Sequence, residues 1–473
     1  MSAPREQFGS RLGFILAAAG SAVGIGNMVG FPVAATKNGG GAFLLIYAIF
    51  VAFICLPVML AEMSVGRHSK KDPLGAYSSM TNGHKGWKLA GWLSIITPFM
   101  IAVFYLVITV WIFGYLFHSV TGNLAMLADP NTFNAFVVGN DLFLYMIAVL
   151  AIIYLILQGG VKQGIEKAAK FMMPTLFIML IALVIFVLTL DNAFQGVKYY
   201  VIPDFSKINA AVVNSALSQA FFSLSLGMGI MITYGSYLDK QTDVPGSAKM
   251  VALLDTAVAF IAGLLILPAI FSFNPDINTN DLSDSSVGMI FTFLPKIFLA
   301  LQASIGYVGA SIVASFFFLL VFFAAITSIV SIFEVPVAAL MEEKQFSRRK
   351  ALGWMGFLLV VFAVLATTSL GMLDFFTSFV SYAGQTKSFF DVIIDVFYDT
   401  ILPLNGLLIC IFVIYRWKKV NLNKELDEGS AGYKSSFFER YVDFSVGTFI
   451  PVILLLIFIN TVALKYFGTA FIG

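Results

Sequence analysis

GSAVGIGNMVGFP, residues 20–32, lies inside a long apolar run that begins near Leu12. Glycine lowers helix stability by about 1 kcal/mol per residue relative to alanine, and proline lacks a backbone N–H donor. Because the stretch holds four glycines and one proline, we predict that its helix is broken at Gly24-Ile25-Gly26. A membrane tolerates the freed backbone only where protein or a polar cavity covers it, and unwound carbonyls bind cations. Close helix packing through small residues is the alternative explanation.

The composition is that of a membrane protein. Of the 473 residues, 59% are hydrophobic and 11% are charged, whereas soluble domains carry about 25% charged residues. The net charge is +2 and the aromatic residues lie within apolar runs, so nucleic acid is not an expected partner. Cys55 and Cys410 each lie in an apolar run, which argues against a disulfide or a cysteine metal site. The first residues lack an Ala-x-Ala cleavage site, so we predict no removable signal peptide.

The apolar runs predict about eleven membrane spans, because each span needs about 20 apolar residues. The fold class is therefore an all-α polytopic membrane protein. The predicted spans cover residues 12–36, 42–66, 89–120, 141–158, 167–190, 209–238, 250–273, 303–341, 351–371, 389–416 and 446–468.

Basic residues collect in alternate loops, next to the first span and after spans two, four, eight and ten. The intervening loops hold fewer of them, and residues 274–286 instead carry Asp276, Asp281 and Asp284. The positive-inside rule therefore predicts a cytoplasmic amino terminus and an external carboxyl terminus.

A second break is predicted in span six, where AFFSLSLGMGIMITYGSY holds Gly227-Met228-Gly229 at its middle. Interruptions at matching places in spans one and six indicate two inverted repeats with a substrate site near the bilayer midplane. We expect the first repeat in residues 1–190, the second in 203–417, and a cytoplasmic loop with the eleventh span in 418–473.

In span eight, Ala324, Thr327 and Ser328 share one helical face by their spacing. Their hydroxyls are candidate ion ligands. Bonding back to the preceding turn of the same helix is the alternative.

Taken together, these motifs resemble the bacterial neurotransmitter:sodium symporter family of eleven-span type, which has the leucine-transporter fold. The resemblance covers nearly the whole chain. It is carried by RLGFILAAAGSAVGIGN, NGGGAF, QGIEKAAKFMMPTLF, SQAFFSLSLGMGIMITYGSY and VFFAAITS. The family couples uptake of amino acids, or of amines derived from them, to sodium. The resemblance thus implies a multi-pass importer of the plasma (inner) membrane that is not an enzyme.

The resemblance implies two Na⁺ sites built from hard oxygen ligands, which suit a hard cation. One site would use Ala22, Asn27, Ser223 and Asp255 with a carboxylate oxygen of the substrate, and the other Gly20, Val23, Ala324, Thr327 and Ser328. An oxygen shared by substrate and ion would couple their affinities. Asp255 supplies a fixed negative charge in span seven, so we expect that chloride is not required.

The resemblance also implies a substrate pocket in which Tyr105 binds the substrate carboxylate beside the Gly26 amide. The pocket residues would be Ser21, Ala22, Ile25, Gly26, Ile101, Tyr105, Phe222, Ser223, Ser225, Met228, Ser328 and Ile332. Monoamine carriers of the family have aspartate where this chain has Gly24, so we expect an intact neutral amino acid, apolar or aromatic. Met228 can re-pack and favours a broad substrate range. Ordinary core packing, and an ordinary partner for a buried tyrosine, are the alternatives.

One departure from the family concerns the outer gate. Most members have arginine where this chain has Gly30, and the matching acid in span ten falls on Ile394 or Asp395. We therefore expect the outer gate to close by packing of Tyr105 against Phe222. For the inner gate, we expect Arg5 to pair with Glu342 or Glu343.

The expected partners are a small-molecule substrate and the lipid bilayer, and no obligate protein partner is evident. His68, His84 and His118 are scattered near membrane edges without metal-ligand spacing, so the pattern does not favour a membrane enzyme. Two alternatives stay open: a sodium-coupled carrier of a related small molecule that is not an amino acid, and a transport-dead sensor or channel on the same fold.

Overall fold

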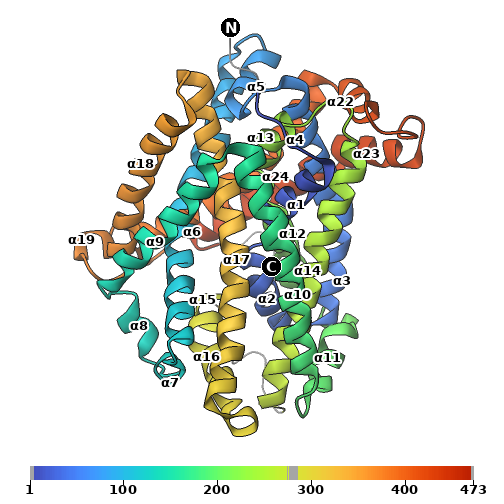
Figure 1. Ribbon diagram of the computed structural model, residues 1–473. Helices are drawn as coiled ribbons and strands as arrows, with labels where there is room; N and C mark the ends of the chain where they lie inside the picture. The colour runs from blue at the N-terminus through green and yellow to red at the C-terminus, as the bar shows by residue number, and fades with distance from the viewer. Residues whose placement is uncertain (1–4, 274, 276–285, 470–473) are drawn as a thin grey trace.

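The computed structural model describes residues 5–273, 275 and 286–469, so Asp276, Asp281 and Asp284 lie outside the described residues. Its long helices form one bundle (Figure 1). Helices α5 and α22 lie at the end that carries the amino terminus, here the N-terminal end, and α7, α11 and α16 lie at the opposite end, here the far end. The short helices outside the spans are α5 (Pro73–Met80), α7 (Leu124–Leu127), α8 (Thr132–Phe136), α11 (Ala193–Val201), η4 (Phe205–Lys207), α15 (Ser286–Gly288), η6 (Met289–Phe293), α16 (Leu294–Ala300), α19 (Asp374–Thr377) and α22 (Lys419–Asp427).

Nine helices in the described residues are long and apolar enough to cross a membrane, and a bent pair makes a tenth. The sixth predicted span forms two helices, α12 (Ala210–Ser223) and α13 (Ile230–Ser236). Counted as one interrupted span, they bring the described part to the predicted eleven, and the all-α polytopic class is confirmed. The other spans are α1 (Arg11–Ala22) with η1 (Gly26–Gly30) and α2 (Phe31–Lys37), α3–η2–α4 (Gly41–Ser69), α6 (Lys85–Val120), α9 (Asp141–Gln158), η3–α10 (Val161–Leu188), α14 (Val244–Phe273), α17 (Gln302–Lys344), α18 (Arg348–Thr368), α20–η7–α21–η8 (Phe389–Trp417) and α23–α24 (Phe437–Phe467).

The outer surface of the bundle is apolar. Side chains such as Leu144, Phe171 and Ile178 are exposed by 67%, 65% and 70%, although they belong to long helices. Contiguous exposed apolar surface of this kind marks a membrane interface. The two cysteines, Cys55 and Cys410, are free and fully buried.

The first break bends the chain by 54° between α1 and the π-helix η1. The last α-helical residue is Ala22, and Val23 adopts a ψ of 95°. The break thus begins slightly before the predicted Gly24-Ile25-Gly26. The carbonyls at the end of α1 therefore lack N–H donors from a following helical turn. Free carbonyl oxygens of this kind can act as cation ligands.

The second break is longer and is held by neighbouring helices. Gly227 and Gly229 have φ values of +75° and +67°, which L side chains rarely adopt. The Gly227 N–H donates to Glu62 Oε1 at 2.8 Å, and its carbonyl accepts from Asn405 Nδ2 at 2.9 Å. Side chains of α4 (Leu56–Ser69) and α21 (Leu402–Ile411) therefore replace the lost helical hydrogen bonds.

A β-hairpin lies between α18 and the tenth span. Strands β1 (Val380–Tyr382) and β2 (Gln385–Lys387) pair antiparallel, with Val380 opposite Lys387. The fairly apolar stretch 371–388 is therefore a connection, and the tenth span begins at Phe389.

An ion cluster fastens α22 to the N-terminal end. Arg67 is fully buried, and its Nε lies 2.7 Å from Glu425 Oε1. Lys240 Nζ and His68 Nδ1 lie 2.8 and 3.1 Å from Glu425 Oε2. Burial alone would raise the pKa of Glu425, but the hydrogen bonds from His68 and Lys240 and the charge of Arg67 lower it to about 2.

We expect Glu425→Gln to lower the free energy of unfolding by about 3–5 kcal/mol at pH 7, because it leaves Arg67 buried without its counter-charge. The folded-state pKa lies below the ordinary 4.5. The contribution is therefore complete above pH 4.5 and is lost as the pH falls toward 2. Thermal unfolding in detergent at several pH values should show the wild-type advantage shrinking over this range. An advantage that does not change with pH would contradict the assignment.

Candidate functional site

A buried polar cluster joins the first break to α12 and α14. Asn27 Nδ2 donates to Asp255 Oδ1 at 2.7 Å and to Ser223 Oγ at 3.0 Å, and Ser223 Oγ donates to Asp255 Oδ2 at 2.9 Å. These three side chains are exposed by 1% or less. The structure thus brings together the side chains expected at the first sodium site, and Ala22 is also buried at the end of α1.

Tyr47 on α3 (Gly41–Phe50) belongs to this cluster, although the sequence analysis did not include it. Its hydroxyl lies 3.1 Å from Ser223 Oγ and 3.2 Å from Asp255 Oδ2. The only sequence signal is that Tyr47 is the single hydroxyl residue in the apolar run 43–58, and a buried tyrosine needs a partner for its hydroxyl.

A second set of oxygens lies between the end of α1 and α17. Ser328 Oγ is 3.3 Å from the carbonyl oxygens of both Gly20 and Val23. Thr327 Oγ1 donates within its own helix, and one of its acceptors is the Ala324 carbonyl at 3.1 Å. Ser328 thus joins Gly20 and Val23 to α17, and Thr327 also lies next to Gly20, where an added Cβ would be 3.2 Å from the Thr327 Cβ. Ala324 is hydrogen-bonded to Thr327 on the same helix. In this structure the Thr327 hydroxyl also donates to the preceding turn of its own helix, which was the alternative interpretation.

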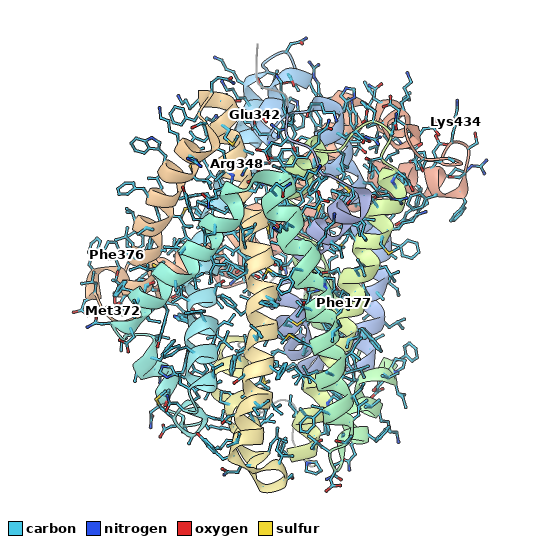
Figure 2. The ribbon with its side chains drawn as sticks, viewed as in Figure 1. Phe177, Glu342, Arg348, Met372, Phe376 and Lys434 are labelled. Atoms are coloured by element: carbon cyan, nitrogen blue, oxygen red, sulfur yellow. The ribbon has the colours of Figure 1, made fainter. Side chains whose placement is uncertain are left out.

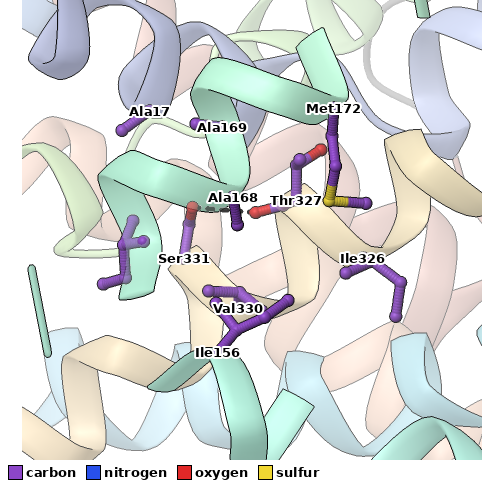
Figure 3. A pocket seen from close by; sticks show the side chains of 10 residues that line it. Ala17, Ile156, Ala168, Ala169, Met172, Ile326, Thr327, Val330 and Ser331 are labelled. Atoms are coloured by element: carbon purple, nitrogen blue, oxygen red, sulfur yellow. Dashed lines mark hydrogen bonds between the residues drawn. The ribbon is translucent and has the colours of Figure 1, made fainter. Parts of the chain in front are cut away.

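A small cavity of about 10 Å³ adjoins this second set, and Thr327 and Ser331 of α17 face Ala168 and Met172 of α10 across it (Figure 3). Ser331 Oγ donates to the Thr327 carbonyl at 2.9 Å. A volume of this size holds about one water molecule.

The tyrosine expected to bind the substrate carboxylate lies beside the first break. Tyr105 Oη accepts a hydrogen bond from the Ile25 N–H at 3.1 Å and is buried. A Cβ added at Gly24 would lie 2.5 Å from Tyr105 Oη and 2.7 Å from Ser328 Oγ. A side chain at position 24 would therefore require Tyr105 or Ser328 to shift.

A cavity of about 440 Å³, here the central cavity, lies against the break. Four of the predicted substrate residues line it, namely Ile25, Gly26, Tyr105 and Phe222. The other predicted residues lie deeper in the protein. Ser225 Oγ donates to the Ser21 carbonyl at 3.0 Å, and Ser328 Oγ to the same carbonyl at 3.2 Å. Ile101, Met228 and Ile332 are exposed by 2% or less and are not among the residues that line this cavity.

Phe222 packs edge-on against Tyr398, with ring centroids 4.4 Å apart. Closure of the outer gate by Tyr105 against Phe222 stays a prediction. Tyr398 belongs to the π-helix η7 (Ile394–Ile401), whose wider turn sets which side chains face α12. Gly30 lines the central cavity. Of the two candidate positions for the acid, Asp395 is charged and forms an ion pair with Lys465.

Ion pairs close the N-terminal end of the bundle, where Figure 2 shows Glu342 and Arg348. Arg5 forms an ion pair with Glu342, the first of its two expected partners, and also donates to Ser236 Oγ at 2.6 Å. Arg348 pairs with the fully buried Glu334 at 2.7 Å. This second pair was not predicted, because neither residue carried a motif in the sequence.

A helical membrane bundle with two interrupted spans and buried oxygen clusters at the interruptions has the architecture of a secondary transporter. A model of the Sodium:neurotransmitter symporter family matches residues 5–137 and 137–471. The chain belongs to this family.

Relatives in sequence and structure agree with this assignment. An uncharacterised sodium-dependent transporter of Bacillus subtilis is 33% identical over 468 residues, which cover 98% of each chain. Another from Methanocaldococcus jannaschii is 35% identical over 83% of this chain and 82% of that protein. The crystal structure of MhsT in complex with L-phenylalanine matches with a TM-score of 0.83 at 37% identity, over 96% of this chain and 99% of that chain. The protein is accordingly a sodium-dependent membrane transporter.

Proposed function

We propose that the protein imports neutral apolar or aromatic amino acids by sodium-coupled alternating access. The observation that carries this proposal is the arrangement at the first break. There Tyr105 and Ile25 line the central cavity, Tyr105 Oη accepts a hydrogen bond from the Ile25 N–H, and an acidic side chain at position 24 would displace Tyr105 or Ser328. A substrate that brings its own carboxylate fits this arrangement better than an amine without one. The likeness to MhsT, solved with L-phenylalanine, supports the same substrate class.

We further propose that two sodium ions bind at the two oxygen clusters, and that chloride is not required because Asp255 supplies the negative charge. In this proposal the N-terminal end is cytoplasmic, the central cavity is the external vestibule, and the plasma membrane is the location. Residues 1–190 and 203–417 are the two inverted repeats. The ion pairs of Arg5 and Arg348 then hold the cytoplasmic side shut.

Uptake by the purified protein in proteoliposomes tests the proposal. Radiolabelled phenylalanine should accumulate against its gradient when sodium is outside, and choline should abolish this accumulation. A competition panel of amino acids and their decarboxylated amines should show inhibition by the amino acids. Stronger inhibition by the amines would favour a carrier of related molecules, and downhill or absent flux would favour a channel or a sensor.

Loss of a hydroxyl at the second oxygen cluster should weaken sodium activation. Thr327→Ala and Ser328→Ala each remove one proposed buried ligand, which costs about 1–3 kcal/mol and raises the half-activating sodium concentration about 5- to 150-fold. Thr327→Ser keeps the hydroxyl and is the matched control. Sodium titrations of uptake that coincide for all of these variants would rule out this ion site.

A further inference from the structure

The tenth and eleventh spans share a charge cluster on the side of η7 that faces α24 (Phe449–Phe467). Asp395 Oδ1 lies 2.8 Å from Lys465 Nζ, and the same nitrogen lies 2.7 Å from Asp399 Oδ2. Lys387 of the hairpin lies 3.5 Å from Asp395 Oδ2, and Tyr382 Oη donates to that oxygen at 2.7 Å. Lys465 is therefore the one cation in the described residues that touches both carboxylates.

The cluster supplies Asp395 with a positive counter-charge that Gly30 of the first span cannot provide. Gly30 brings no charge to the central cavity, yet the side chain of Asp395 is only 5% exposed. A buried carboxylate needs a counter-charge, and in this chain Lys465 supplies it from the last span. Lys465 lies on a different helix from Gly30, so the charge holds η7 toward α24 and not toward α2.

Lys465 also lies close to the aromatic pair formed by Phe222 and Tyr398. A second cavity of about 510 Å³, here the side cavity, is lined by Asp399 and Lys465 as well as by Phe222 and Tyr398. Phe222 and Tyr398 also line the central cavity. Phe222 and Tyr398 thus border both hollow spaces, and Lys465 lines the side cavity, where it is paired with Asp399, the residue next to Tyr398.

We propose that Lys465 is a positioning residue for closure of the central cavity. Through Asp395 and Asp399 it fixes the π-helix η7 so that Tyr398 meets Phe222 over bound substrate. This inference rests on the proposed function, because it takes the central cavity as the external vestibule. Substrate retention then depends on an ion pair between the last two spans.

A single cysteine in the central cavity can report its closure. Ala34 lines the cavity, and the native Cys55 and Cys410 are fully buried, so Ala34→Cys provides the accessible thiol. The rate of labelling by a charged, membrane-impermeant thiol reagent is measured in choline, in sodium, and in sodium with phenylalanine. In the Ala34→Cys background we expect sodium with phenylalanine to slow labelling about tenfold, a typical size for ligand-coupled conformational change.

Adding Lys465→Met should reduce this protection to about twofold or less. Lys465→Arg should retain it, and so should Lys198→Met, which removes an exposed lysine of α11. Asp395→Asn should also reduce protection, and the double variant Lys465→Met/Asp395→Asn should lose no more than Lys465→Met alone, because Lys465→Met already removes the pair with Asp395. Lys465→Met leaves a buried carboxylate without this partner. If that variant does not fold, the labelling rate is measured with the double variant instead.

The outcomes separate the two proposals. Full protection in Lys465→Met, or additive losses in the double variant, would overturn the role of Lys465 and leave the proposed function standing. No protection by phenylalanine in the Ala34→Cys background would overturn the proposed function, and with it the closure that Lys465 is proposed to control.

Discussion

Asp255→Asn will raise the sodium concentration needed for half-maximal uptake about 10- to 100-fold. Hydrogen bonds and contacts to a charged group contribute about 1.5–3 kcal/mol each, and 1.4 kcal/mol is a factor of ten in affinity. Asp255 is fully buried, and its carboxylate is held by Asn27, Ser223 and Tyr47. An acid in the middle of a span is costly and is by default a functional residue, and the role that we propose for Asp255 is to hold a cation.

The measurement is a sodium titration of uptake in proteoliposomes, with chloride or gluconate as the anion. Wild-type uptake should be the same in both salts, whereas Asp255→Asn should be partly rescued by chloride, because a mobile anion replaces the lost charge. Asp191→Asn, on an exposed residue, is the matched control. Collapse of wild-type uptake in gluconate would contradict the role of Asp255 as the fixed negative charge.

Gly24→Asp will abolish uptake of amino acids. The added Cβ alone would lie within 2.7 Å of Tyr105 Oη and Ser328 Oγ, and overpacking of this kind costs about 1–3 kcal/mol or more. The new carboxylate would also repel that of the substrate. Both effects act on the site where substrate and sodium are proposed to meet.

Binding of phenylalanine by scintillation proximity, in high sodium, measures this loss directly. Gly24→Ala should lose most of the affinity through overpacking alone. Gly353→Ala should not, because a Cβ at Gly353 meets nothing within 4 Å. Wild-type affinity in Gly24→Asp would show that position 24 does not border the substrate site.

The spans and both breaks could be predicted from sequence because their signals are local. Apolar runs are readable without any partner, and Gly227 and Gly229 mark a place where a helix cannot continue cheaply. The hairpin at 380–387 was not predictable in this way. Its turn uses Ala383 and Gly384, both with positive φ, and alanine is not among the residues that favour such a turn.

The site was only partly readable from sequence. Asn27, Ser223 and Asp255 were named through the family resemblance, and the structure brings them into contact. The sequence did not predict contacts between helices whose residues carry no motif. Such contacts depend on how each helix is rotated about its axis, which the sequence does not show. Tyr398 rather than Tyr105 faces Phe222, since the π-helical turn of η7 shifts the register of the side chains that follow.

The glycine link in the sixth span also bears on how this chain tolerates mutation. A Cβ at Gly227 would meet the backbone of Leu402, one at Gly229 would meet the Ser94 carbonyl, and each glycine has a φ that strains other residues. Replacing either glycine alone meets backbone that cannot move aside, and it leaves the other glycine in place. A single substitution at either position therefore cannot restore a continuous helix.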